Sequence, residues 1–175
     1  MSEASTADQT NPFQRLRALY PEALPEVYGY LRHRSGDPAL AEDLAAETFL
    51  QAARSLRDGT VGVVTTGWLV TVARHKLIDH WRRQSRTERA LSAVEGGGSA
   101  GGWDEHLDGM LAMDTLRSLN AQHRAALTLR YVDDLPVAEV AEQLGRTVHA
   151  TEALLVRARA AFRRAYEARG GGGDA

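Results

Sequence analysis

The side chains of this chain that could do chemistry are mostly cationic, and they occur in two clusters. Between positions 74 and 89, six Arg or Lys side chains accompany two carboxylates, and between positions 157 and 169, five Arg side chains accompany one. The whole chain nevertheless carries a formal net charge of −2. Two basic clusters in a nearly neutral chain predict two contact points with an acidic polymer and little affinity for it elsewhere.

The first basic cluster has aromatic neighbours, Trp68 and Trp81. Rings beside cations can stack on unpaired bases, which favours binding to single-stranded nucleic acid. A run of charge is more often a solvated helix face, and Trp81 falls on an apolar stripe, where a core position is the favoured interpretation. Both alternatives are open from the sequence.

The sequence contains no pattern typical of an enzyme. It has no glycine-rich phosphate loop, no HExxH pair and no serine-centred elbow, and its carboxylates are not paired. Cysteine is absent, which excludes disulfides, thiolate metal sites and a cysteine nucleophile, and the six histidines are scattered. We therefore predict no catalytic site, no metal and no other cofactor.

The elements that position the charged side chains are predicted to be helices, because apolar residues recur at spacings of three and four. One amphipathic segment over 41–56 has an acidic opposite face, and Asp37 and Pro38 fit its N-cap and first helical position. The acidic face could be simply solvated, or it could dock another protein. An earlier amphipathic segment contains Pro21 and Pro25, which we expect to break the helix near its middle.

The most informative passage is a short amphipathic segment followed by a glycine and a longer segment. Pro136 opens the first helix, Gly145 ends it, and a new helix is expected to start after Thr147. This spacing is typical of a helix-turn-helix, whose second helix enters the major groove of DNA, although any helical bundle could contain it. The exposed face of the second helix is predicted to carry His149, Glu152, Ala153, Val156, Arg157 and Arg164.

A glycine-rich segment separates the two halves of the chain. Positions 92–102 hold five glycines and no periodic apolar residues. We predict an all-α protein with two small helical domains, at 12–91 and 105–167, joined by a flexible linker over 92–104. With 43% hydrophobic residues among 175, both domains can form a core.

The sequence shows neither a run of eighteen apolar residues nor a secretion signal at its start. We therefore expect no membrane insertion and a cytoplasmic location.

Three linked passages resemble the two-domain sigma factors of the extracytoplasmic-function (ECF) group, in the sigma-70 family. They are DLAAETFLQAARSL at 43–56, WLVTVARHKLIDHWRR at 68–83 and LRYVDDLPVAEVAEQLGRTVHATEALLVRARAAFRR at 129–164. The resemblance covers nearly everything from Leu19 to Arg164. It implies an alternative sigma factor, which binds core RNA polymerase and directs promoter-specific initiation of transcription without catalysing covalent chemistry.

The resemblance also implies roles for individual residues. The first passage matches the helix that grips the clamp helices of the largest polymerase subunit, through Asp43, Leu44, Glu47, Thr48 and Phe49. The second, with the loop before it, matches the part that melts and reads the −10 element, through Trp68, Arg74, His75, Lys76, Arg82 and Arg83. The helix-turn-helix matches the reader of the −35 element, through Thr147, His149, Glu152, Ala153, Val156 and Arg157.

The partners that the resemblance implies are core RNA polymerase, at its beta-prime clamp and beta flap, and promoter DNA. Many members of the group are held inactive by an anti-sigma factor, which is therefore a candidate partner. The free protein is expected to be a monomer.

The sequence departs from the usual pattern of the group at two places. His75 stands where the group usually has Asn, and the loop DGTVGVVTTG before it lacks the aromatic residue often found there. Glu152, Ala153 and Leu154 stand where the group usually has a basic residue, Ser and Arg. A carboxylate is repelled by phosphate but can accept a hydrogen bond from cytosine N4. We therefore expect a −35 sequence that differs from the common one of the group.

The main alternative is a DNA-binding repressor or activator that uses the same helix-turn-helix and an N-terminal half for dimerisation or sensing. It predicts a stable homodimer that binds duplex operator DNA without polymerase. A nucleotide hydrolase, a third alternative, would need a phosphate loop that the sequence lacks. The segment over 43–83 has no role in a simple repressor, which favours the sigma factor.

Overall fold

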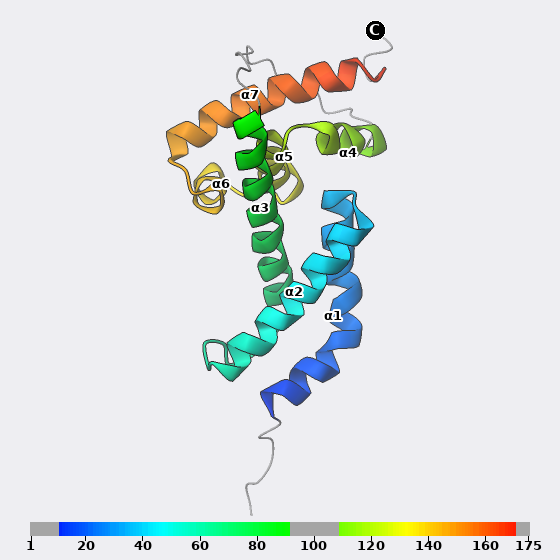
Figure 1. The fold of residues 1–175 in the computed structure, drawn as a ribbon, viewed down its shortest axis with the longest axis vertical. Coiled ribbons are helices and arrows are strands. Elements are labelled where there is room, and N and C mark those ends of the chain that lie inside the picture. The colour runs from blue at the N-terminus through cyan, green and yellow to red at the C-terminus, as the bar shows by residue number, and fades with distance from the viewer. Residues whose placement is uncertain (1–10, 92–108, 171–175) are drawn as a thin grey trace, which may run out of the picture. The chain divides into compact units, whose positions relative to one another are not determined.

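The computed structural model describes residues 11–91 and 109–170, which form seven α-helices and one π-helical turn without any strand (Figure 1). The all-α prediction is confirmed. Backbone contacts divide the chain into two units, Met1–Lys76 and Leu77–Ala175, with the division inside α3 (Thr66–Leu91). The predicted linker over 92–104 lies outside the described residues, so the bounds proposed for the two domains stay a prediction.

The first unit is built from α1 (Pro12–Ser35), α2 (Pro38–Arg57) and the first part of α3. α1 and α2 pack along each other, joined by the short turn at Gly36 and Asp37 (Figure 1). The core of this unit is made of small and branched apolar side chains, namely Ala23, Val27, Leu31, Ala41, Leu44, Ala45, Ala52, Leu69 and Ala73.

α1 runs without interruption through Pro21 and Pro25, so the predicted break in this helix is wrong. The two prolines are four residues apart and both are exposed, on the side of α1 opposite the buried Ala23 and Val27. A proline leaves a carbonyl of the preceding turn without its helical partner. On a solvent-facing side that carbonyl can bond to water, and the helix can continue with a bend.

α2 begins where the sequence predicts. Asp37 is its N-cap, and the carboxylate of Asp37 accepts hydrogen bonds from the backbone N–H groups of Ala39 at 2.9 Å and Leu40 at 3.2 Å. Pro38 occupies the first helical position, where a missing N–H costs no helical hydrogen bond. This cap fixes where the acidic face of α2 starts.

The second unit holds the rest of α3 with α4 (Gly109–Ser118), α5 (Ala121–Leu127), α6 (Val137–Leu144) and α7 (Val148–Glu167). α7 packs against α4, α5 and α6. The core comprises Leu77, Ile78, Trp81, Leu116, Ala125, Leu127, Leu129, Val140, Leu154, Leu155 and Phe162. Trp81 is 1% exposed, which agrees with the core interpretation of this ring.

Arg124 is a half-buried cation in this second unit. Its guanidinium lies over the ring of Trp81 at 5.0 Å and donates to Gln84 Oε1 at 3.0 Å and to the Arg117 carbonyl at 3.1 Å. Burial lowers the pKa of Arg124, and the nearby charge of Glu88 opposes that shift. The guanidinium thus ties the last part of α3 to α4 and α5.

Between α5 and α6 the chain widens into a π-helical turn, η1 (Thr128–Val132). The N–H of Asp133 donates to the Thr128 carbonyl at 2.9 Å, and Asp134 follows with a φ of 52°. The sequence predicts one helix through Ala125 and Tyr131, and the structure instead ends the α-helix at Leu127. The widened turn redirects the chain into the helix-turn-helix.

Candidate functional site

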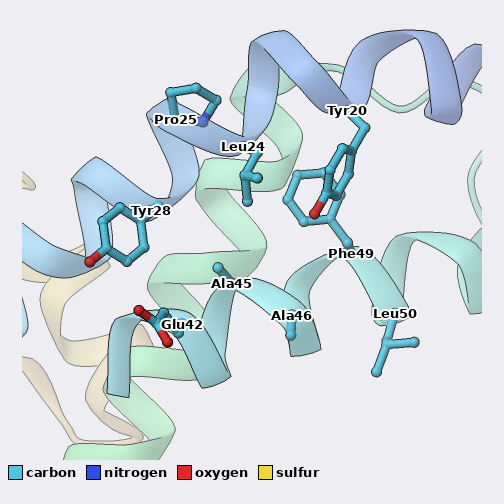
Figure 2. Close-up of a pocket in the computed structure, with 9 residues that line it drawn as sticks. All are labelled: Tyr20, Leu24, Pro25, Tyr28, Glu42, Ala45, Ala46, Phe49 and Leu50. Carbon is cyan, nitrogen blue, oxygen red and sulfur yellow. The ribbon is translucent and has the colours of Figure 1, made fainter. Parts of the chain in front are cut away.

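The exposed face of α2 is acidic and borders an apolar groove. Asp43 and Glu47 are four residues apart and exposed, so their carboxylates lie on one side of the helix. A groove of about 700 Å³ lies between α1 and α2. Figure 2 shows the residues that line it, which are Tyr20, Leu24, Pro25, Tyr28, Glu42, Ala45, Ala46, Phe49 and Leu50.

Two aromatic rings meet at one end of this groove. The centroids of Tyr20 and Phe49 are 4.7 Å apart with an angle of 60° between the rings, a favourable tilted geometry (Figure 2). Tyr20 remains 45% exposed and Leu50 56% exposed. Exposed apolar side chains beside carboxylates are typical of a protein-binding surface. We call Tyr20, Asp43, Glu47, Phe49 and Leu50 the α2 face.

The structure separates the five residues predicted to bind polymerase into two groups. Asp43 and Glu47 are exposed and Phe49 is half-buried in the groove. Leu44 is 3% exposed and Thr48 is fully buried, with the Thr48 hydroxyl donating to the Leu44 carbonyl at 2.7 Å. Both side chains lie inside the packing of α2 and are not exposed to a partner in this structure.

Sequence reasoning missed two members of the α2 face, Tyr20 and Leu50. Leu50 lies seven residues after Asp43 and three after Glu47, so it shares their side of the helix. An apolar residue on an otherwise polar helix face was the signal that could have identified it. Tyr20 comes from α1, and only the packing of α1 on α2 brings its ring to Phe49.

An ion pair between Glu47 and Lys76 connects α2 to α3 within the first unit. Glu47 Oε2 lies 3.4 Å from Lys76 Nζ, and the lysine side chain is 22% exposed. The sequence places these residues in two different predicted sites, the polymerase contact and the −10 contact. The structure brings the two sites together at this point.

The start of α3 is fixed by Thr65. Its hydroxyl accepts from the Trp68 N–H at 3.2 Å, and its carbonyl accepts from the Leu69 N–H at 3.0 Å. Seven residues make nearly two helical turns, so Trp68 and His75 fall on the same side of α3. Of the six predicted −10 contacts, three are exposed, His75, Arg82 and Arg83, and three are half-buried, Trp68, Arg74 and Lys76.

The predicted helix-turn-helix is present as α6 and α7. Gly145 ends α6 with a φ of 62°, in the left-handed region that favours glycine, and the Arg146 N–H donates to the Ala141 carbonyl at 2.9 Å. Thr147 caps α7, its hydroxyl accepting from the Ala150 N–H at 3.2 Å. The predicted start of the second helix is confirmed.

The first turns of α7 divide cleanly into a buried side and an exposed side. Thr151 and Leu154 are fully buried and Leu155 is 4% exposed. All six predicted −35 contacts are accessible, four of them exposed, Thr147, His149, Glu152 and Arg157, and two half-buried, Ala153 and Val156. Val148, which sequence reasoning missed, is 47% exposed at the first position of the helix.

Within residues 11–91 and 109–170, no group of three or more His, Asp or Glu side chains could hold a metal ion. Over the same residues, no helix combines the length and the hydropathy needed to cross a bilayer.

Comparison with known proteins matches both units to one family. Sigma-70 region 2 matches residues 19–87, and Sigma-70, region 4 matches residues 110–162. The ECF RNA polymerase sigma factor BldN of Streptomyces coelicolor is 36% identical over 163 residues, which cover 89% of this chain and 61% of BldN. The ECF RNA polymerase sigma factor SigL of Mycobacterium tuberculosis is 34% identical, over 74% of this chain and 76% of SigL.

Among solved structures, the sigma factor RpoE from Bartonella quintana, in complex with the anti-sigma factor NepR, shares the fold. It has a TM-score of 0.52 and 19% identity, and the match covers 88% of this chain and 98% of that one. The match to both sigma-70 regions and the identity to SigL, over three quarters of its length, agree with the all-helical fold and the helix-turn-helix described above. The chain belongs to the ECF group of the sigma-70 family of RNA polymerase sigma factors.

Proposed function

We propose that this chain binds core RNA polymerase through the α2 face and directs it to promoters that α3 and α7 recognise. The observation that carries the proposal is the combination, in one chain, of an exposed acidic and apolar helix face with a separate helix-turn-helix. A repressor would need the helix-turn-helix and an N-terminal half for dimerisation or sensing, but no surface that docks polymerase. A sigma factor needs both surfaces.

The polymerase contact is proposed to be the clamp helices of the largest subunit. Asp43 and Glu47 supply charge for a basic partner, and Leu50 with the rings of Tyr20 and Phe49 supplies apolar area. Apolar anchors surrounded by charged groups are the usual composition of an interface with a few dominant contacts. The beta flap is the proposed second contact of polymerase, with the second unit.

The −10 contact is proposed to lie along the exposed side of α3. Arg82 and Arg83 would bind phosphates, and Trp68 and His75 would face unpaired bases. Stacking and cation contacts to the separated strand would offset the free energy of unstacking a base. Binding energy alone would then open the promoter, without hydrolysis of ATP.

The α2 face is also the proposed site of inhibition by an anti-sigma factor. Tyr20 and Leu50 remain about half exposed in the free chain, and a partner covering them would block the clamp contact directly. Such a competitor would bind one copy of the free protein. We accordingly propose a cytoplasmic monomer that alternates between inhibitor and polymerase.

Run-off transcription tests this proposal. Purified core polymerase is incubated with the chain on promoter fragments, and specific transcripts are expected only when the chain is present. Asp43→Lys and Leu50→Asp should abolish them, because both alter exposed members of the α2 face. Glu26→Lys is the matched control, since Glu26 is an exposed carboxylate of α1 that does not line the groove.

The opposite outcome would favour the alternative. If core polymerase gains no start site, and the chain instead shifts duplex operator DNA as a homodimer, the protein is a repressor or activator. If transcripts appear but Asp43→Lys leaves them unchanged, the chain is a sigma factor that docks through another surface.

A further inference from the structure

The side of α7 that faces DNA in a helix-turn-helix carries one row of side chains with unusual chemistry. Val148, Glu152 and Val156 are spaced by four residues, so they follow one another along the same side of the helix. Val148 is 47% exposed, Glu152 is exposed and Val156 is half-buried. We call these three residues the reading row.

We propose that the reading row selects pyrimidines in the −35 element: a cytosine at Glu152, with a thymine on one or both sides within about two base pairs. The inference rests on the proposed function, because it assumes that α7 is the helix in the major groove. It goes further by assigning base types to individual side chains.

The choice of cytosine follows from the donors and acceptors of Glu152. An ionised carboxylate only accepts hydrogen bonds, and Glu152 forms no hydrogen bond or ion pair with any of the described residues. In the major groove, only cytosine N4 and adenine N6 donate. Adenine presents its N7 acceptor beside N6, which repels a carboxylate, whereas guanine and thymine present acceptors alone.

The choice of thymine follows from the two valines. Val148 and Val156 offer methyl groups and no polar atoms, and the thymine C5-methyl group is the apolar contact that the major groove provides. Four helical residues span about 6 Å, and successive bases of one strand are about 3.4 Å apart. Each valine is therefore within reach of a base one or two steps from the base that Glu152 contacts.

The cations beside the reading row offset the repulsion between the Glu152 carboxylate and the DNA phosphates. Arg146 precedes α7, and Arg157 is exposed five residues after Glu152. Phosphate contacts from such residues fix the register of the helix without reading sequence. His149, also exposed near the N-terminus of α7, can join them.

Selection from a promoter library tests the base assignment. Holoenzyme made from core polymerase and the wild-type chain transcribes a library with randomised −35 positions, and the transcribed templates are sequenced. We expect one position to be enriched in cytosine about tenfold or more, next to thymines. Glu152→Gln should move that position to adenine, which a carboxamide can bind through N6 and N7. Glu167→Gln, an exposed carboxylate at the far end of α7, should leave the selected sequence unchanged.

Uracil probes the thymine contacts separately, because it lacks only the C5-methyl group. Replacing the selected thymines by uracil should lower transcription by the wild-type holoenzyme several-fold, and Val156→Ala should reduce that difference. The same selected sequence with Glu152→Gln, or no effect of uracil, would overturn the inference while the proposed function stands. If the wild-type chain yields no specific transcript at all, the proposed function itself fails, and the base assignment with it.

Discussion

Glu47 and Lys76 form an ion pair of 3.4 Å between α2 and α3, and this pair joins the proposed polymerase contact to the proposed −10 contact. Glu47 is the more exposed partner, at 56% against 22% for Lys76. The carboxylate can therefore meet a cation of polymerase while the lysine stays beside α2. A charge on polymerase would then compete with Lys76 for Glu47.

The ion pair should contribute little to stability. In a double-mutant cycle of Glu47→Gln and Lys76→Gln, we expect a coupling energy below about 1 kcal/mol, because water screens a pair of which one member is half exposed. Urea unfolding of the four proteins measures it. A coupling energy above about 2 kcal/mol would show that the ion pair stabilises the fold. It would contradict the proposal that a charge on polymerase competes with Lys76 for Glu47.

Truncation of Leu44 should reduce stability, whereas truncation of Leu50 should reduce binding to polymerase. Both residues lie in the passage that resembles the clamp-binding helix. Leu44→Ala removes a buried side chain and is expected to destabilise the first unit by about 2–5 kcal/mol. Leu50→Ala should change stability by less than about 0.5 kcal/mol and weaken binding to core polymerase about tenfold. Thermal unfolding and fluorescence anisotropy separate the two effects, and equal effects on both readouts would refute the division.

Gly145 should resist substitution because its φ of 62° is left-handed. Gly145→Ala is expected to cost about 1–2 kcal/mol, since a Cβ is strained there. Gly145→Asn should cost less, because Asn visits this region more readily. Urea unfolding tests both variants, and equal losses would mean that the turn adapts and that the left-handed geometry is not required.

Arg157 should contribute to the salt dependence of promoter binding. If its guanidinium binds a phosphate, Arg157→Gln will lower the slope of log K against log salt by about one unit for every promoter sequence. The control is Arg169→Gln, two residues after the end of α7. Its slope is expected to equal that of the wild type. A loss confined to certain −35 sequences would instead identify Arg157 as a base reader.

The helix-turn-helix was predictable from the sequence because its local rules are strict. Gly145 supplies the left-handed turn and Thr147 the next cap, and both positions hold as predicted. Leu69, Ala73 and Leu77 are spaced by four residues and are all buried, because helical spacing fixes which side of the helix faces the core.

The parts that sequence reasoning missed depend on packing between elements. Pro21 and Pro25 signal a break locally, yet both are exposed, and the packing of α1 on α2 supports the continuous helix. The matching passage of the family includes Leu44 and Thr48 without showing that their side chains point inward. Tyr20 joins the α2 face only because α1 folds onto α2.

Lys76 is the only lysine of the chain, and it is the one held by Glu47. Among the side chains of this sequence, Lys76 therefore offers the single primary amine to acylating reagents. The rate at which a succinimidyl ester modifies the Lys76 amine would report whether the ion pair between Lys76 and Glu47 is formed. Chemical modification of Lys76 in the wild-type chain would thus show whether a partner protein covers the α2 face.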